Sequence, residues 1–201
     1  MWDQRYAEPG YWYGKQPAKF LTSASSQLKP GSKLLCVADG EGRNSVYLAT
    51  LGHQVTAFDP SPVAVEKARQ LARENGVAPQ YNVAGIEDWD WNQQFDAVVG
   101  IFIQFAPPDL RTQLFGWMAQ AVAPGGLLLL HGYESRQVGY GTGGPPDASR
   151  MYTTDLLADA FAGFDVLRLE DYDTEVDEGR GHSGLSALVD LVARKPDTMQ
   201  A

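Results

Sequence analysis

Short apolar runs alternate along this chain with segments whose apolar residues recur every three or four positions. The runs are typical of buried strands, and the helical spacing is typical of helices that cover a sheet. Strands are predicted over Lys33–Ala38, Gln54–Phe58, Gln80–Ala84, Phe95–Ile103 and Leu127–Tyr133. Helices are predicted over Arg43–Leu51, Ser61–Asn75, Pro107–Ala123 and Thr153–Phe161, with Ser61 as an N-cap.

Two further strands, Phe164–Tyr172 and Leu185–Ala193, follow without a helix between them. Strands separated by helices predict a parallel sheet, whereas two consecutive strands predict an antiparallel pair at its edge. The sequence therefore predicts one α/β domain with a mostly parallel seven-stranded sheet and helices on both faces. We divide it into an N-terminal cap over residues 1–30, a core over 31–133, and a loop with the C-terminal strands over 134–201.

Composition narrows the function classes. The 201 residues suit one domain, and 25 acidic against 16 basic residues give a net charge of −9. A nucleic-acid or anionic-membrane partner is not expected, because proteins that bind such partners carry clustered basic residues and this sequence shows no such cluster. The single Cys36 leaves no internal disulfide or multi-cysteine metal site, so no metal is expected. Without a signal-like start or a long apolar run, a cytoplasmic monomer or homodimer is expected.

The first predicted strand runs into a turn of small residues that opens a helix. Ala38, Gly40 and Gly42 leave room for a ligand to approach the backbone, and the helix start offers free N–H groups to an anion. Ligands of such folds bind beyond the carboxyl ends of the strands. An ordinary tight connection between a strand and a helix is the alternative interpretation of this turn.

An acid closes the second predicted strand. Asp59 lies 19 residues after Gly40, close to the spacing of about 20 expected for the acid that holds ribose hydroxyls. An N-cap role is the alternative interpretation of Asp59. Together, the turn and the acid indicate a nucleotide-containing ligand, and a dinucleotide remains an alternative at this point.

Four segments together resemble the class I S-adenosylmethionine-dependent methyltransferases. They are Leu34–Asn44, Val55–Ser61, Phe95–Val99 and Ala123–Leu128, in the order and spacing of that family. The opening Trp2–Tyr6, with Tyr13, Gly14 and Pro17, is similar to the tellurite-resistance branch of the family. The chain departs from the family pattern at Cys36, where many members carry an acid, and at Ala38, where they carry glycine.

The resemblance implies a Rossmann-like methyltransferase fold and S-adenosylmethionine as cofactor. The cofactor contacts that it implies come from Ala38, Asp39, Gly40, Gly42, Asn44, Asp59, Pro60, Ile86, Glu87, Phe102 and Gln104. Asp39 is placed to meet the cofactor's amino group, and Ile86 with Glu87 to meet adenine. For Glu87 and Gln104, a solvated charge and a polar strand end remain the alternatives.

Three regions are candidates for the acceptor pocket. An aromatic N-terminal segment with Tyr6 and Tyr13 is the first, as a lid, and the glycine-rich run Tyr140–Pro146 is the second. A surface helix and a flexible loop are the respective alternatives. The third contains Arg180 and His182, which we assign as candidate catalytic residues: an anion holder and a base or orienting donor. A solvated loop is the alternative for this third region.

The expected activity is methyl transfer to a small molecule, with a thiol or a chalcogen oxyanion as candidate acceptors. No obvious catalytic base is present, which fits catalysis by orientation of the reactants. The alternatives are a nicotinamide-dependent oxidoreductase, a non-catalytic S-adenosylmethionine-binding module, and a methyltransferase that acts on tRNA or protein.

Overall fold

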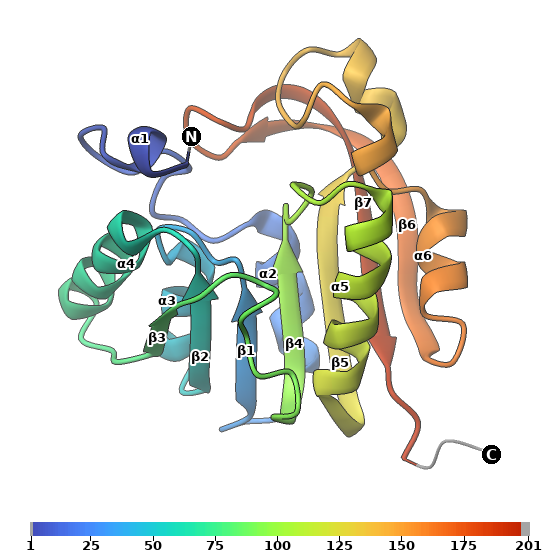
Figure 1. Cartoon of the computed structure of the whole chain (residues 1–201), viewed down its shortest axis with the longest axis horizontal. Helices are drawn as coiled ribbons and strands as arrows, with labels where there is room; N and C mark the ends of the chain where they lie inside the picture. The colour runs from blue at the N-terminus through green and yellow to red at the C-terminus, as the bar shows by residue number, and fades with distance from the viewer. Residues whose placement is uncertain (1, 198–201) are drawn as a thin grey trace.

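A seven-stranded sheet forms the centre of the computed structural model, which describes residues 2–197 (Figure 1). Its strand order is β3-β2-β1-β4-β5-β7-β6. The strands are β1 Lys33–Val37, β2 Gln54–Asp59, β3 Gln80–Val83, β4 Phe95–Ile101, β5 Val122–Tyr133, β6 Asp165–Asp177 and β7 Ser183–Arg194. β1 to β5 pair in parallel, and β7 is antiparallel to both of its neighbours. The predicted sheet and its antiparallel edge pair are confirmed.

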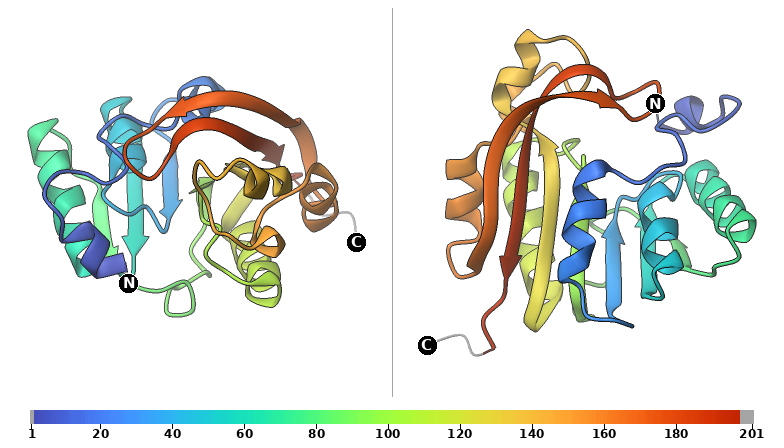
Figure 2. Two further views of the ribbon diagram at one scale, coloured as in Figure 1. Left: turned by 90° about the horizontal axis from the view of Figure 1, so that it is seen from above. Right: turned by 180° about the vertical axis from the view of Figure 1, so that it is seen from behind.

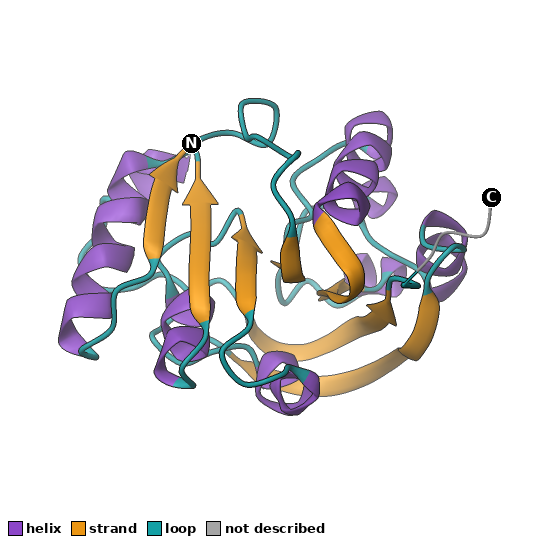
Figure 3. Ribbon diagram, turned by 90° about the horizontal axis from the view of Figure 1, so that it is seen from below, coloured by secondary structure: helices purple, strands orange, loops and turns teal. Residues whose placement is uncertain are grey.

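Helices cover both faces of this sheet (Figure 3). They are α1 Trp2–Tyr6, α2 Lys19–Ala24, α3 Arg43–Thr50, α4 Pro62–Glu74, α5 Pro108–Ala121 and α6 Thr154–Ala160, with 3-10 turns at Ser25–Gln27, Ser135–Gly139 and Ala148–Arg150. Apolar side chains of α2 and α3 pack on one face, and those of α5 and α6 pack on the other. None of the described helices is long and apolar enough to cross a membrane.

The hairpin of β6 and β7 extends beyond the rest of the sheet and curves towards the N-terminal segment (Figures 1 and 2). At its turn, the backbone N–H of Arg180 donates to the carbonyl of Trp12 at 2.8 Å. β6 continues to Asp177, beyond the predicted end at Tyr172, because its outer half alternates exposed and more buried residues. β7 begins at Ser183, two residues before the predicted start. The hairpin thus brings its turn against the N-terminal segment, beyond the carboxyl ends of the parallel strands.

Several predicted boundaries shift in the structure. Ser61 caps α4 as predicted, since its hydroxyl accepts from the Ala64 N–H at 3.2 Å. The fourth strand ends at Ile101 and not at Ile103, because Phe102 takes a positive φ of 56° that turns the chain. The predicted helix over Pro107–Ala123 ends at Ala121, where the extended backbone of Val122 begins β5.

Candidate active site

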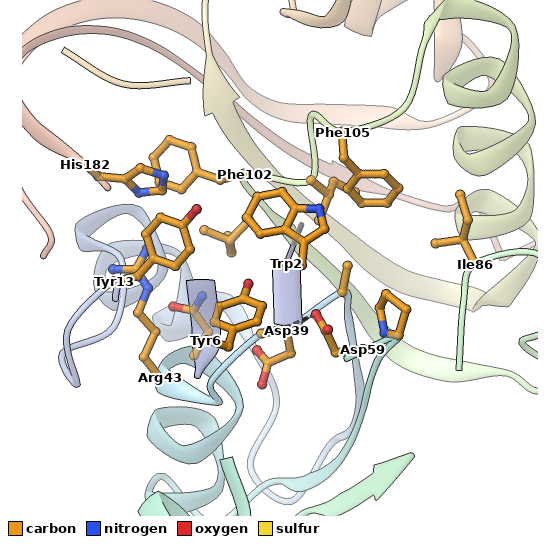
Figure 4. A pocket seen from close by; sticks show the side chains of 16 residues that line it. Trp2, Tyr6, Tyr13, Asp39, Arg43, Asp59, Ile86, Phe102, Phe105 and His182 are labelled. Carbon is orange, nitrogen blue, oxygen red and sulfur yellow. Dashed lines mark hydrogen bonds between the residues drawn. The ribbon is translucent and has the colours of Figure 1, made fainter. Parts of the chain in front are cut away.

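A cavity of about 210 Å³ lies beyond the carboxyl ends of β1, β2 and β4. It is lined by Trp2, Tyr6, Tyr13, Ala38, Asp39, Gly40, Arg43, Asn44, Asp59, Pro60, Ile86, Ile101, Phe102, Ile103, Phe105 and His182. Figure 4 shows Tyr13, Phe102 and His182 grouped at one end, with Asp59 and Ile86 at the other. This is the edge of the sheet where ligands of open α/β folds bind.

The small residues after β1 form a turn that most side chains do not fit. Gly40 and Gly42 have φ angles of 60° and 89°, and Ala38 has a φ of 47°. A Cβ at Gly42 would lie 2.6 Å from that of Ala68, so Gly42 allows α3 and α4 to pack closely. A Cβ at Gly40 would lie 3.0 Å from the Tyr6 hydroxyl, inside the cavity. Gly40 therefore leaves space in the cavity, whereas Gly42 allows the two helices next to it to pack together.

Asp59 lies at the end of β2 and faces the glycine turn. Its Oδ2 accepts the Gly40 N–H and its Oδ1 accepts the Ser61 N–H, each at 2.9 Å. Burial raises the pKa of Asp59, and the two backbone hydrogen bonds oppose this shift. The carboxylate is thus fixed in position with lone pairs left for a ligand, because an ionised carboxylate has about four acceptor sites.

Asp39 is the second carboxyl group at this end of the cavity. Burial raises its pKa to about 7, and a hydrogen bond from the Ser45 hydroxyl opposes the shift. Nearby Asp59 raises it further. A buried carboxyl group whose pKa is close to 7 is well suited to pair with a cationic ligand group. The positive charge of that group favours the ionised form of the carboxyl.

Phe102 occupies a strained backbone position at the end of β4. Its φ of 56° is rare for a bulky residue, and its N–H donates to the His131 carbonyl at 2.8 Å. Its ring centroid lies 4.8 Å from the centroids of His131 and Tyr133, and 4.0 Å from that of His182. Backbone strain of this kind persists only where packing around the residue holds it in place, and it is found most often at functional sites.

His182 enters the cavity from the turn between β6 and β7. Its side chain packs against Tyr13 and Phe102, with centroid distances of 4.5 Å and 4.0 Å, and Nδ1 has no hydrogen-bond partner among the described residues. Burial lowers the pKa of His182 far below its usual range, and Arg43 reinforces this effect. The imidazole is therefore neutral at physiological pH, and a proton acceptor with so low a pKa is a weak base.

Three aromatic residues of the N-terminal segment contribute to the wall of the cavity. Trp2, Tyr6 and Tyr13 line the cavity, and burial raises the pKa of the Tyr6 hydroxyl with a contribution from Asp59. The Trp12 N–H donates to Glu41 Oε2 at 2.6 Å, which ties the segment to the glycine turn.

Two glycines of the β6–β7 turn receive this segment. A Cβ at Gly179 would lie 2.5 Å from the Tyr13 carbonyl carbon, and one at Gly181 would lie 2.3 Å from the Tyr13 ring. The turn and the N-terminal segment therefore approach one another as closely as the backbone allows.

Sequence reasoning missed Arg43 and Glu178. The Arg43 guanidinium lines the cavity, and its Nη1 lies 2.8 Å from Glu178 Oε2, with both side chains under a tenth exposed. Glu178 also accepts the Lys19 N–H at 3.2 Å. Arg43 follows the glycine turn directly, and Glu178 is close to His182 in the sequence, so each was a visible candidate. No local sequence pattern, however, indicates that two positions so far apart form an ion pair.

Four predicted site residues do not line the cavity. Gly42 packs against α4, Glu87 is exposed, and Arg180 is exposed with its Nη1 3.3 Å from Glu8. Gln104 was expected to face the ligand from the end of β4. Instead, its buried amide donates to the Tyr133 carbonyl and accepts the Tyr133 N–H, both at 2.7 Å, because the chain has already turned at Phe102. The other predicted residues, Ala38, Asp39, Gly40, Asn44, Asp59, Pro60, Ile86, Phe102 and His182, all line it.

The glycine-rich run Tyr140–Pro146 covers Tyr133 and does not line the cavity. Gly143 forms a β-bridge with His182, and a Cβ at Gly144 would lie 2.8 Å from the Tyr133 ring. Residues 2–197 contain no group of three or more histidine, cysteine or acidic side chains able to hold a metal ion. The arrangement suits an adenosine-like ligand at one end and a second small molecule at the aromatic end.

Comparisons with known proteins agree with this geometry. A family model described as a methyltransferase domain matches residues 34–126. A ubiquinone biosynthesis O-methyltransferase of Xanthomonas axonopodis pv. citri (strain 306) is 38% identical over 113 residues, which are 55% of this chain and 47% of that protein. The chain thus spans about half the length of the curated relatives it matches.

Solved structures share the fold at low sequence identity. One, described as "Conversion of a Disulfide Bond into a Thioacetal Group during Echinomycin Biosynthesis", has a TM-score of 0.78 and 19% identity, covering 98% of this chain and 88% of its own. TehB from Haemophilus influenzae has a TM-score of 0.71 and 20% identity, covering 87% of this chain and 61% of its own. Magnesium protoporphyrin IX methyltransferase from Synechocystis PCC 6803 with bound SAH has a TM-score of 0.68 and 17% identity, covering 88% and 79%.

Proposed function

Because this chain belongs to the class I S-adenosylmethionine-dependent methyltransferases, we propose that it transfers a methyl group from S-adenosylmethionine to a small molecule. The acceptor would bind at the aromatic end of the cavity, beside Tyr13, Phe102 and His182. Thiols and chalcogen oxyanions were the acceptors considered from sequence, and the curated relatives are O-methyltransferases by name.

The residues of the cavity fit S-adenosylmethionine. Asp59 would accept hydrogen bonds from the ribose hydroxyls, and Pro60 with Ile86 would contact the adenine. Asp39 would pair with the ammonium group, and the free N–H groups at the start of α3 would meet the carboxylate. The absence of a Cβ at Gly40 supports this assignment, since that atom would enter the space the ligand needs.

The chain's own part in the reaction is to bind and orient the two reactants. The bound donor supplies a methyl group that its sulfonium already activates. Tyr6, Tyr13 and Trp2 cover the cavity and exclude water, and Phe102 holds one wall rigid. Orientation of this kind lowers the barrier of a displacement without a catalytic base.

One observation carries the proposal: Asp59 and Gly40 meet at 2.9 Å on the wall of a single cavity. The acid that would hold ribose is thus in direct contact with the turn that would receive the rest of the donor. Both features that the sequence indicates for a nucleotide therefore lie on the wall of one cavity, which supports the proposal.

Thermal melting with S-adenosylhomocysteine and, separately, with NAD tests the donor assignment. Stabilisation by RT ln(1 + [L]/Kd) is expected with S-adenosylhomocysteine and not with NAD. The opposite result would favour the oxidoreductase alternative. Transfer of a labelled methyl group to a small-molecule panel, with tRNA and a protein extract as further arms, separates an enzyme from a binding module and from a macromolecular methyltransferase.

A further inference from the structure

The acceptor end of the cavity is built from aromatic rings. Tyr13 and Phe102 flank His182 at centroid distances of 4.5 Å and 4.0 Å, and Tyr133 stands edge-on to it at 5.5 Å. His182 lines the cavity and is 6% exposed, whereas Tyr133 is 1% exposed and lies behind His182, outside the lining. The His182 Nδ1 and the Tyr133 hydroxyl both lack a hydrogen-bond partner among the described residues. This surface suits a flat apolar molecule with few polar atoms.

The cations at this end are engaged by the protein. Arg43 is the one arginine or lysine among the described residues that line the cavity, and its guanidinium is paired with Glu178 at 2.8 Å. Arg5 does not line the cavity: its guanidinium lies over the rings of Trp2 and Trp12 at 4.8 Å and 5.1 Å, and its Nη1 donates to the Tyr13 hydroxyl at 3.5 Å. Asp39 and Asp59 supply carboxyl groups and no cation to the opposite wall. An anionic acceptor would therefore meet no unpaired cation among the described residues that line the cavity.

We propose that the acceptor is a neutral, planar and largely apolar molecule whose nucleophile is an uncharged lone pair, such as a heteroaromatic nitrogen or a thioether sulfur. This inference rests on the proposed function and narrows its acceptor. It sets aside chalcogen oxyanions, because the cavity offers aromatic faces and paired charges where an oxyanion needs free donors.

The step balances without a base. The acceptor's lone pair forms the new bond to the methyl carbon, and the electron pair of the carbon–sulfur bond returns to sulfur. No proton leaves the acceptor, so no catalytic base is needed. The weakly basic imidazole of His182 serves only to contact the acceptor. The product carries the positive charge, which the faces of Tyr13 and Phe102 stabilise by cation–π attraction.

Calorimetry on the S-adenosylhomocysteine complex tests this acceptor class. Quinoline and thioanisole serve as neutral probes, and selenite and a simple phenol serve as competitors. The neutral probes are expected to bind at least about tenfold more tightly than selenite, and quinoline is expected to accept label from S-adenosylmethionine.

Each outcome decides between the two proposals. If S-adenosylhomocysteine binds but selenite or the phenol binds or is methylated in preference to the neutral probes, the acceptor inference is overturned and the proposed function stands. Failure of both neutral probes to bind that complex also overturns the inference. If S-adenosylhomocysteine itself does not bind, the proposed function fails.

A charge variant tests the role of the ion pair directly. Glu178→Gln keeps an oxygen for the Lys19 N–H but leaves the Arg43 guanidinium without its carboxylate. Selenite affinity is expected to rise roughly tenfold, the scale of a hydrogen bond to a charged group. Glu175→Gln, on the exposed face of β6, is the matched control and should leave it unchanged. A Glu178→Gln protein that melts cooperatively and binds selenite no better than the parent contradicts the charge argument.

If Glu178→Gln does not fold, the calorimetric comparison of quinoline and thioanisole with selenite on the parent complex decides the inference without a variant.

Discussion

Ala38 and Phe102 take positive φ angles of 47° and 56° at the ends of two neighbouring strands, β1 and β4. Conformations of this kind cost on the order of 1–3 kcal/mol for non-glycine residues. Both residues line the cavity, and packing around them holds the backbone in place. Part of the folding free energy is thus used to define the shape of the site.

Asp59 provides the first test at this scale. Asp59→Asn removes the charge but keeps the size of a side chain that Gly40 and Ser61 contact. Affinity for S-adenosylhomocysteine is expected to fall by about 1.5–3 kcal/mol, the range for hydrogen bonds to charged groups. Calorimetry measures this, with the exposed Glu66→Gln on α4 as control. Unchanged affinity in Asp59→Asn would remove Asp59 from the donor site.

Asp39 makes stability depend on pH. Burial raises its pKa to about 7, against about 3.9 in an unfolded chain. The folded state therefore holds the proton more tightly, and the stability this confers is present below about pH 4 and lost as pH rises through 7. In the ligand-free protein, Asp39→Asn should lose less Tm than the parent between about pH 5 and about pH 8. Parallel Tm curves for parent and variant would contradict a proton held by Asp39.

At the scale of elements, the β6–β7 hairpin positions both the N-terminal segment and His182. The Arg180 N–H donates to the Trp12 carbonyl at 2.8 Å, and Glu178 N–H donates to the His182 carbonyl at the same distance. Gly179 has a φ of 78° and Gly181 lies against the Tyr13 ring. Closure of the cavity therefore depends on the fit between two segments more than 160 residues apart in the chain.

Gly179→Ala tests this fit. The added Cβ would lie 2.5 Å from the Tyr13 backbone, where nothing flexible can yield. The N-terminal segment is expected to detach, which limited proteolysis would detect as faster cleavage within residues 2–17, together with weaker S-adenosylhomocysteine binding. Gly163→Ala, where a Cβ meets nothing within 4 Å, is the control. Equal cleavage rates in the two variants would argue against a fitted closure.

At Gly116, in contrast to Gly179, an added Cβ is expected to stabilise the protein. Gly116 lies in the middle of α5 on the exposed side, and a Cβ there meets nothing within 4 Å. Gly116→Ala should stabilise the protein by about 0.5–1 kcal/mol, because glycine loses more backbone entropy on folding. Denaturant unfolding measures the change, and a destabilised variant would show that Gly116 serves a contact absent from this structure.

Features that depend on residues close together in the sequence could be predicted, whereas features that depend on contacts between distant residues could not. The strands and helices of the core were predictable because each buries a face whose period is local, and Asp59 with Gly40 followed from a short motif. Gln104 was misplaced because the turn at Phe102 depends on packing against His131 and Tyr133 from other elements. Arg43 and Glu178 were missed for a similar reason, since their pairing exists only in three dimensions.

For the whole molecule, the distribution of charge disfavours a polyanionic partner. The net charge is −9, and β6 alone carries acidic residues at Asp165, Glu170, Asp171, Asp173, Glu175 and Asp177. A surface of this sign repels polyanions, so long-range attraction to nucleic acid is not expected.

Electrophoretic mobility with bulk tRNA at low salt checks this expectation. No shift is expected at micromolar protein, because nonspecific binding depends on release of counterions by basic residues. A salt-sensitive shift would reveal a local basic surface and would restore a macromolecular acceptor as a candidate.

The position of Trp2 has a practical consequence for anyone who handles this protein. Trp2 lines the cavity at the carboxyl ends of the strands, whereas Asp197 lies beside Gly125 near the start of β5, at the other end of that strand. An affinity handle or fluorescent reporter fused ahead of Trp2 would crowd the entrance and distort measurements of binding. A fusion joined directly after Asp197 would begin away from the entrance.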